Sequence, residues 1–225
     1  MTTYILSPSD FSFLWEECKR CFYLKLVRKF NRPASPFPNI FGIIDREMRT
    51  YFMWKETSAM SPDLPPGLMI FGEKWVQSAP IHLDGHTAAC AIRGKLDAVL
   101  QFEDGSYGVI DFKTSDIKTA SLQLYARQLR AYAYALEHPA PGKFALSPVS
   151  HMGLLAFTPD TYTAEGTTRS TLSGMLKWHA IQRNDESFMG FLNEVLTVLE
   201  LPEPPAADPQ CEWCQYREAS RATGL

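Results

Sequence analysis

The chain has 225 residues, of which 45% are hydrophobic and 21% charged, and its formal net charge at pH 7 is -3. This composition is that of an ordinary globular protein and excludes a disordered or fibrous class. The length suits one domain, which we expect to span residues 1–225 with its core over about 40–200. No apolar run reaches the roughly 18 residues that span a membrane, and the N-terminus lacks the features of a signal peptide. We therefore expect a cytoplasmic protein with no membrane partner.

The first two predicted elements are amphipathic helices. Residues 9–30 have apolar side chains at helical spacing, and Ser7 or Ser9 is placed to cap this helix. The proline-rich stretch NRPASPFPN should end it. A second helix is predicted over IFGIIDREMRTYFMWKE, and a loop around SPDLPPG follows it.

Basic residues gather in the first helix, with no acidic residue between Lys19 and Arg32. Such a patch can bind phosphates even on a weakly acidic protein. A solvated helix face would explain the same charges. The residues that we expect to contact nucleic acid are Lys19, Arg20, Lys25 and Arg28.

The middle of the chain changes to a β pattern. Residues 89–102 and 106–114 read as two strands of a hairpin around the turn-forming sequence EDG. A helix is predicted over 121–138, a strand over 151–159 and a further helix from about 171 to 199. The proline-rich spacer LPEPPAADP then leads into CEWCQYRE.

The second strand contains VIDFKTS, in which Asp111 and Lys113 lie two residues apart. Side chains alternate along a strand, so these two share one face, about 6.6 Å apart along the backbone, while Ile110 and Phe112 share the other. Whether Asp97 of the first strand joins them depends on the turn.

Two turns are possible between these strands. A two-residue loop at Asp104 and Gly105 would place Asp97 and Asp111 on different faces. A three-residue EDG loop, with Gly105 in the left-handed conformation, pairs Asp97 directly with Asp111. We favour the second turn, because the glycine stands where that turn needs it and the polar residues then share a face.

Two adjacent carboxylates repel each other unless a cation neutralises them, and oxygen ligands favour Mg²⁺ or Mn²⁺. Such an ion beside a lysine suits phosphodiester hydrolysis. The alternative is a surface ion pair between Asp111 and Lys113, which is the commoner explanation of an isolated DxK sequence.

Four segments together resemble a known family: LSPSDFSFLWEECKRCFYLKL, GKLDAVL, VIDFKTS and QLRAYAYAL. Their order and spacing resemble the PD-(D/E)xK nucleases, specifically the RecB-like branch that includes the CRISPR-adaptation-associated exonucleases. The resemblance implies an α/β, restriction-endonuclease-like fold, in which helices flank a central mixed β-sheet. It also implies a metal-dependent DNA nuclease, which we expect to be an exonuclease.

The residues that match the family's catalytic positions are Asp97, Asp111, Lys113, Gln128 and Tyr132. The resemblance implies that Asp97 and Asp111 bind Mg²⁺ or Mn²⁺, with the carbonyl of Phe112 completing part of the shell. Lys113 would be the catalytic lysine. Gln128 and Tyr132 match the QxxxY motif and, four residues apart, share one helix face.

One metal ligand of the family is missing. The family commonly has an early histidine after a glycine, whereas FGIIDREM contains none. Asp45 is our candidate substitute, because it falls on the apolar stripe with Phe41, Met48 and Phe52 and should point inward. Glu47 is the second choice.

Cys18 and Cys21 near one terminus, and Cys211 and Cys214 near the other, form two CxxC pairs. In a cytosolic protein such pairs are more often metal-binding than disulfide-bonded. Some RecB-like nucleases join their termini through four cysteines around a four-iron cluster, and this arrangement is similar. We call residues 9–30 and 208–218, joined in this way, the cysteine clasp.

The usual family pattern has a last cysteine where this chain has Ser220, so Cys21 would supply the fourth ligand. We favour a 4Fe-4S cluster on the resemblance, with Zn²⁺ as the alternative, since four thiolates suit both. Cys90, alone in a predicted strand, is expected to be a small buried residue.

The leading hypothesis is thus a nuclease that acts on DNA, with single-stranded ends as the expected substrate, in repair, recombination or foreign-DNA processing. No GxxxxGK[ST] motif occurs, so unwinding would need a helicase or another repair or CRISPR partner. The alternatives are a catalytically inactive DNA-binding or scaffold subunit that keeps the fold and the clasp, and a zinc-clasped interaction module.

Overall fold

The structure is a computed structural model that describes residues 2–34 and 38–224. Its larger sheet has the strand order β2-β5-β6-β7-β8, with β6 and β7 parallel and the other neighbours antiparallel. These strands are β2 (Gly67–Phe71), β5 (Ala98–Phe102), β6 (Tyr107–Lys113), β7 (Val149–Glu165) and β8 (Arg169–Ala180). The smaller sheet consists of β1 (Thr3–Leu6), β4 (Ala89–Leu96) and β3 (Lys74–Gln77), in that order.

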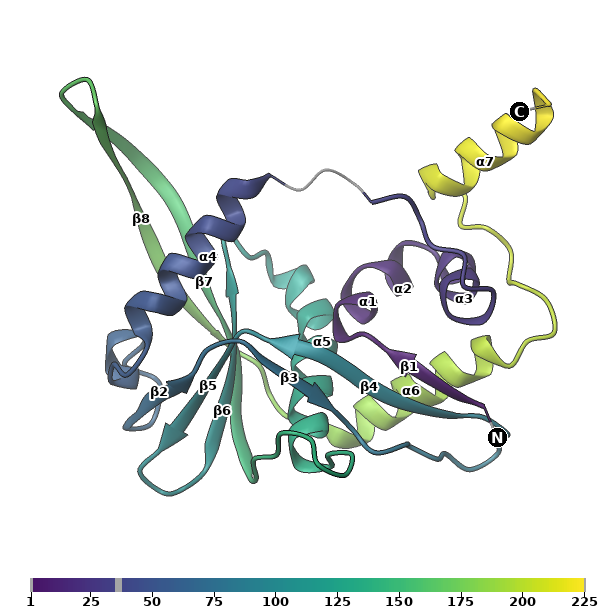
Figure 1. Cartoon of the computed structure of the whole chain (residues 1–225), viewed down its shortest axis with the longest axis horizontal. Helices are drawn as coiled ribbons and strands as arrows, with labels where there is room; N and C mark the ends of the chain where they lie inside the picture. Colours follow the sequence, from purple (N-terminus) through teal and green to yellow (C-terminus); the bar gives the residue numbers. More distant parts are fainter. Residues whose placement is uncertain (1, 35–37, 225) are drawn as a thin grey trace.

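Helices flank these sheets (Figure 1). They are α1 (Pro8–Ser12), α2 (Leu14–Glu17), α3 (Lys19–Val27), α4 (Asn39–Phe52), α5 (Thr119–Glu137), α6 (Asp185–Leu199) and α7 (Glu212–Ala222), with a 3-10 turn η1 (Thr57–Ala59). The predicted α/β fold, with a mixed sheet between helices, is confirmed. No helix within the described residues is long and apolar enough to cross a membrane.

The predicted hairpin around EDG is confirmed in its register. Ala98 pairs with Ile110 and Gln101 with Tyr107, and Gly105 has a φ of 83°. One step beyond the first pair places Asp97 opposite Asp111. The strand predicted over 89–102 is however divided at Asp97, because β4 belongs to the smaller sheet and β5 to the larger one.

The helix predicted over residues 9–30 is wrong as a single element. The chain leaves helical geometry at Phe13 (φ -120°, ψ -70°) and again at Cys18 (φ -169°, ψ 107°), so three short helices replace it. Ser7 is the residue before α1, but its hydroxyl bonds to that of Ser9 rather than capping the backbone. Part of the proline-rich stretch expected to end this helix, residues 35–37, lies outside the described residues.

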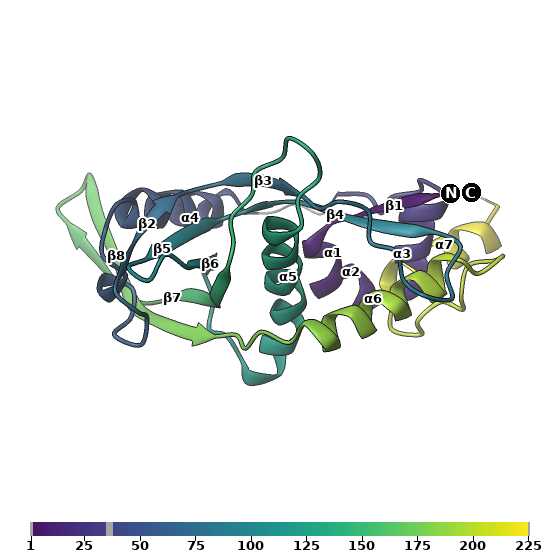
Figure 2. The ribbon, with the colours of Figure 1, turned by 90° about the horizontal axis from the view of Figure 1, so that it is seen from below.

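The helix predicted from 171 to 199 is also wrong over its first half. Residues 169–180 form β8, which pairs with β7 from Gly153 and Ala180 out to Glu165 and Arg169. A long partner strand overrides the helical spacing of its apolar residues. The β7–β8 ribbon extends to the end of the molecule away from the termini (Figures 1 and 2). The helix itself, α6, begins at Asp185, with the Asn184 side chain accepting a hydrogen bond from the Ser187 N–H at 2.8 Å.

The core has two parts. One joins α5 and α6 to the sheets and includes Leu129, Val109 and Leu192. The other lies beneath α4, where Phe52 stacks on Phe112 with ring centroids 6.2 Å apart. The alternation of β6 is therefore as predicted: Phe112 anchors one face of the strand, and Asp111 is left on the face toward α5.

Candidate active site and cysteine centre

A pocket of about 550 Å³ lies beside β6, where α4, α5 and the beginning of β5 meet. We call it the acid pocket. It brings together acids and a lysine that are up to 68 residues apart in the chain. The sequence-predicted residues that line it are Asp45, Asp97, Asp111, Phe112, Lys113 and Gln128, and the aromatic residues among its walls also include Phe13, Phe41 and Tyr125.

Asp111 is held from two sides at the base of the acid pocket. The Gln128 amide donates a hydrogen bond to Asp111 Oδ1 at 2.9 Å, and the Lys113 ammonium forms an ion pair with Asp111 Oδ2. Asp111 is only 3% exposed. Burial opposes the charge of Lys113, but the attraction of Asp111 outweighs it and raises the pKa of the lysine. The ammonium thus neutralises a carboxylate that has almost no contact with water.

Asp97 lies across from Asp111, at the junction of the two sheets. Its Oδ2 accepts a hydrogen bond from the Phe112 N–H at 3.1 Å. Burial raises the pKa of Asp97 well above its usual value, and the nearby charge of Asp111 adds to the shift. Asp97 therefore needs a cation close by if it is to stay ionised together with Asp111.

Asp45 reaches the acid pocket from α4. Its Oδ2 forms an ion pair with Arg49 at 2.9 Å, while its Oδ1 is buried without a hydrogen-bond partner. Burial raises the pKa of Asp45. The predicted inward direction is thus observed, although the apolar stripe used to infer it is largely exposed: Phe41 is 37% exposed, and Phe52 alone is buried among the residues of α4. Glu47 instead pairs with Arg46 on the surface.

The QxxxY residues support two different strands. Gln128 contacts Asp111 on β6, whereas the Tyr132 hydroxyl donates to the backbone carbonyl of Lys95 on β4 at 2.9 Å. Tyr132 does not line the acid pocket. The two side chains share a helix face, as predicted, and together they attach α5 to both β6 and β4.

Two polar neighbours of the site were missed by the sequence analysis. Arg49, one helical turn after Asp45, bridges it to Glu73, with 2.9 Å separating charged atoms in each pair. The i, i+4 spacing of an acid and an arginine was a signal for this contact. The Ser12 hydroxyl lies 3.5 Å from the Gln128 side-chain oxygen. This contact joins distant segments, so no local sequence pattern predicts it.

The basic residues predicted to contact nucleic acid are engaged within the protein. Lys25 forms an ion pair with Asp10 at 2.7 Å, and the Arg20 guanidinium donates to the carbonyl of Pro205 at 3.2 Å. None of the four lines the acid pocket. The other two are also in contact: Arg28 with Glu203, and Lys19 with the ring of Trp15.

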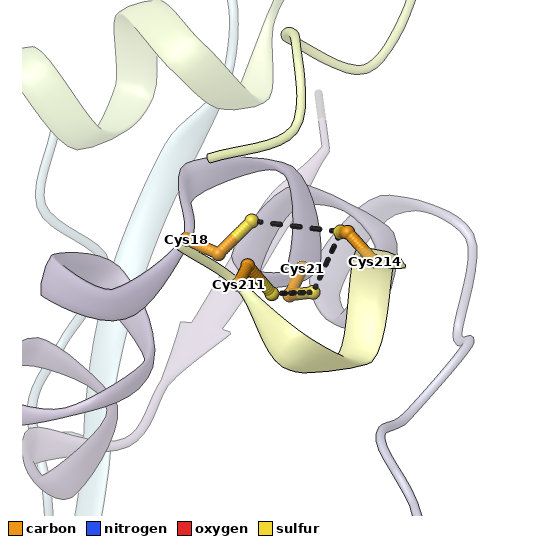
Figure 3. Close-up of side chains that lie close together, drawn as sticks. All are labelled: Cys18, Cys21, Cys211 and Cys214. Carbon is orange, nitrogen blue, oxygen red and sulfur yellow. Dashed lines mark hydrogen bonds between the residues drawn. The ribbon is translucent and has the colours of Figure 1, made fainter. Parts of the chain in front are cut away.

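The four clasp cysteines meet where the two terminal regions come together (Figure 3). Cys18 and Cys21 come from the beginning of α3, and Cys211 and Cys214 from the beginning of α7. All four sulfur atoms lie within 4.8 Å of one another, and each cysteine is buried and free of disulfide. The predicted joining of the N- and C-terminal regions at a four-cysteine centre is confirmed.

The surroundings of these thiols suit a cation. Burial opposes the Cys18 thiolate, but backbone hydrogen bonds and neighbouring thiols outweigh it and lower its pKa to about 7. Burial raises the pKa of Cys21 and of Cys214. Four thiolates packed this closely repel one another, so a positive ion is needed to ionise them all. The Arg32 guanidinium, 3.3 Å from the sulfur of Cys211, supplies one adjacent charge.

The two candidate metal sites differ in compactness. Among the described residues, the cysteines alone form a group of three or more potential ligands whose atoms all lie within 4.8 Å of one another. The acid pocket is wider, yet Asp45 Oδ1 is buried without a hydrogen-bond partner, and the Lys113 ammonium is the one partner of the buried Asp111 Oδ2 among the described residues. Such carboxylate oxygens fit a hard divalent cation, which would satisfy them.

A model of the PD-(D/E)XK nuclease superfamily matches residues 45–219. No curated protein matches the sequence. A solved structure described as "Crystal structure of SSO0001" resembles the chain with a TM-score of 0.46 at 16% identity, covering 89% of this chain and 79% of that one. Because the superfamily match extends over the greater part of the sequence, the chain belongs to the PD-(D/E)XK nuclease superfamily.

Proposed function

We propose that this protein is a Mg²⁺- or Mn²⁺-dependent exonuclease that hydrolyses phosphodiester bonds of DNA at single-stranded ends. The observation that carries the proposal is the acid pocket, in which Asp45, Asp97, Asp111 and Lys113 converge and the buried Asp45 Oδ1 has no hydrogen-bond partner. Its setting would be DNA repair, recombination or foreign-DNA processing, with a helicase or CRISPR protein as the possible partner.

The chain's own residues have distinct tasks in this proposal. Asp45, Asp97 and Asp111 would hold the divalent ion, which polarises the phosphoryl oxygen and activates water for attack. Gln128 keeps one oxygen of Asp111 turned toward α5, so that the other faces the acid pocket. Lys113, which lines the acid pocket and pairs with Asp111, would stabilise the charge that develops on the phosphate.

End-labelled single- and double-stranded DNA with Mn²⁺ or Mg²⁺ tests this proposal. Asp111→Asn and Lys113→Met should each lower the cleavage rate by about 10²-fold or more, the loss typical of a removed charge-stabilising group. The control is Asp160→Asn, an exposed acid on the β7–β8 ribbon. Cleavage that resists both substitutions would assign the activity to a contaminant and contradict the proposal.

The second candidate, a catalytically inactive DNA-binding or scaffold subunit, is favoured by one observation. Lys113 already neutralises Asp111, so this carboxylate of the acid pocket is charge-compensated without a divalent ion. If pure protein binds DNA but cleaves none with any divalent metal, and calorimetry detects no Mn²⁺ binding that depends on Asp111, this second function holds.

For the cysteine clasp the spacing of the sulfur atoms favours one ion over a cluster. A single Zn²⁺ with Zn–S bonds of about 2.3 Å in a tetrahedron separates its sulfurs by about 3.8 Å. The separations here are 3.8 Å from Cys18 to Cys214, 3.7 Å from Cys21 to Cys211 and 3.6 Å from Cys21 to Cys214. In a 4Fe-4S cluster each thiolate binds its own iron, which moves the sulfurs farther apart. We therefore propose Zn²⁺ here, although the family resemblance favours the cluster.

Metal analysis of protein purified without oxygen separates the two. Zinc should be present at one equivalent, the preparation should be colourless, and Cys214→Ala should lose the zinc while Cys90→Ala, at a buried thiol outside the clasp, retains it. A brown protein with about four equivalents of iron and of inorganic sulfide would show the cluster instead.

A further inference from the structure

A second groove lies on the exposed face of the β3–β4 pair, beside the acid pocket. Its volume is about 360 Å³, and its walls come from β1, α1, α3 and α5 as well as from the two strands. Ser9 lines both this groove and the acid pocket, so the two are neighbours across one residue. We call it the strand groove.

The strand groove leads toward the acid pocket along β4. Arg93 and Lys95 alternate with buried residues on that strand and are exposed, and the next residue in the alternation is Asp97. Two basic side chains thus precede Asp97 of the acid pocket along the same segment of chain. A phosphate backbone lying along β4 would pass from cations that attract it to the site proposed to cleave it.

An aromatic surface lies opposite these cations. Trp75 on β3 pairs across the strands with Lys95 and is 63% exposed. The guanidinium of Arg93 lies 5.6 Å from the Trp75 ring. An indole with an accessible face, next to cations, is the combination by which proteins bind unpaired nucleic-acid bases.

The acids near the strand groove balance some of its charge. Lys95 pairs with Glu73 at 2.7 Å, and Lys25, which also lines the groove, pairs with Asp10 at 2.7 Å. Arg93 forms no ion pair within the part of the chain that the structure describes. It is therefore the cation best placed to bind a phosphate.

We propose that the strand groove binds an unpaired segment of DNA next to the scissile phosphate, with a base stacked on Trp75 and a phosphate held by Arg93. The direction of this path rests on the proposed nuclease function of the acid pocket. A duplex is a poorer fit, because its bases stack on each other and leave no face for Trp75. This assigns a binding role to β3 and β4, outside the acid pocket.

Binding measured without cleavage tests the proposal. Fluorescence anisotropy of a labelled single-stranded oligonucleotide, in buffer without added divalent metal, should show Kd raised about 5- to 150-fold in Trp75→Ala, the range for losing one stacked base. In Arg93→Gln the slope of log Kd against log salt should fall by about 0.7, the value for one phosphate contact with a single strand. Exposed controls are Tyr162→Ala on β7 and Arg221→Gln on α7, which should leave both quantities unchanged.

Unchanged binding in Trp75→Ala and Arg93→Gln, or equally weakened binding in the controls, would contradict the proposed role of the strand groove. So would a blunt duplex whose affinity falls as much in Trp75→Ala as the affinity of the single strand does. A small phosphodiester such as bis(4-nitrophenyl) phosphate separates this failure from that of the nuclease proposal, because it has no neighbouring nucleotide to lie along the strand groove. Both variants should hydrolyse it at the wild-type rate with Mn²⁺. Groove-dependent binding by a protein that hydrolyses neither substrate would support the groove and contradict the nuclease function.

Discussion

At the scale of single residues, the acid pocket is a problem of buried charge. Asp111 is nearly inaccessible to water and lies opposite Asp97, whose pKa is raised by burial and further by the charge of Asp111. Lys113 is the cation that the chain itself supplies. A divalent ion bound as proposed would compete with Lys113 for the same carboxylate oxygen, so stability and metal binding should depend on each other.

Lys113→Met should destabilise the protein when no divalent metal is present. Removing one partner of a buried pair costs about 3–5 kcal/mol, and at about 2–4 °C of Tm per kcal/mol for a chain of this size the loss is easily measured. Added Mn²⁺ should raise the Tm of this variant more than that of wild type. Differential scanning fluorimetry with and without Mn²⁺ checks this, with Lys143→Met, at an exposed loop residue, as the control. Equal melting temperatures in metal-free buffer would show that the pair contributes nothing.

A second residue-scale prediction concerns the loop before β4, which is tied to the end of α6. His86 Nδ1 lies 2.7 Å from the Glu200 carboxylate, and its Nε2 lies 2.9 Å from the side-chain oxygen of Asn193. Two acceptors require both ring nitrogens to carry a proton, and the hydrogen bond with Glu200 raises the pKa of His86.

Because the folded-state pKa of His86 is raised, its stabilising contribution is complete below the unfolded value of about 6.5 and is lost as pH rises through the higher folded value. The Tm difference between wild type and His86→Gln should therefore be largest near pH 5.5 and shrink at alkaline pH. Thermal melts across this range check the trend, with His82→Gln, at an exposed histidine, as the matched control. A difference that grows with pH would contradict the charged pair.

At the scale of elements, close packing near Gly94 holds β4 against α1 and α5. A Cβ at this position would lie 2.8 Å from the Pro8 ring and 3.0 Å from the Tyr132 ring. Both rings are fixed in position, since Tyr132 is buried and its hydroxyl is bonded to Lys95. Gly94 thus permits the close approach of α5, which carries the QxxxY motif, to β4, the strand that ends just before Asp97.

Gly94→Ala should accordingly lower the free energy of unfolding by about 1–3 kcal/mol, as overpacked cores do. Gly190→Ala in α6, where a Cβ would meet nothing within 4 Å, should raise it by up to about 1 kcal/mol through helix propensity. Urea denaturation of the two variants measures both signs. A neutral Gly94→Ala would mean that α5 can shift away from β4 at no cost.

Element type was predictable where the pattern was local. The QxxxY helix and the EDG turn follow from periodicity and from a glycine at a left-handed position. β8 was misassigned because its apolar residues fall at helical spacing, and its strand character comes from antiparallel pairing with β7 across the turn at Gly166. The short strands β1, β2 and β3 were missed because each has five residues or fewer, which is too short for a clear alternation of apolar and polar residues.

At the scale of the whole molecule, the cysteine clasp joins the two ends of the chain. Cys214 is the one residue of α7 that is buried, so little besides the clasp attaches this helix to the rest. The spacer before it, residues 201–210, is mostly exposed or half-exposed. The organisation of residues 1–225 as a single domain remains a prediction. In such a domain, the cysteine clasp would be the feature that attaches the terminal segments to the rest of the fold.

Cys214→Ala should release α7 while leaving the sheets folded. Limited proteolysis followed by mass spectrometry should then show cleavage within residues 201–210 at least about tenfold faster than in wild type, because local opening exposes that segment. Removing the clasp metal with a chelator should have the same effect on wild type, whereas Cys90→Ala should digest like wild type. Equal resistance in all forms would mean that other contacts hold α7.

The sequence by itself determined the chemistry: the acids and lysine of β6, their alternation, the turn that pairs Asp97 with Asp111, the QxxxY spacing and the two CxxC pairs all depend on local geometry. Only the tertiary structure decided that Asp45 Oδ1 is buried without a hydrogen-bond partner, which basic residues are already paired, how closely the four sulfurs approach, and that a second groove adjoins the acid pocket. These depend on contacts between segments tens to hundreds of residues apart, and no periodicity within one segment encodes them.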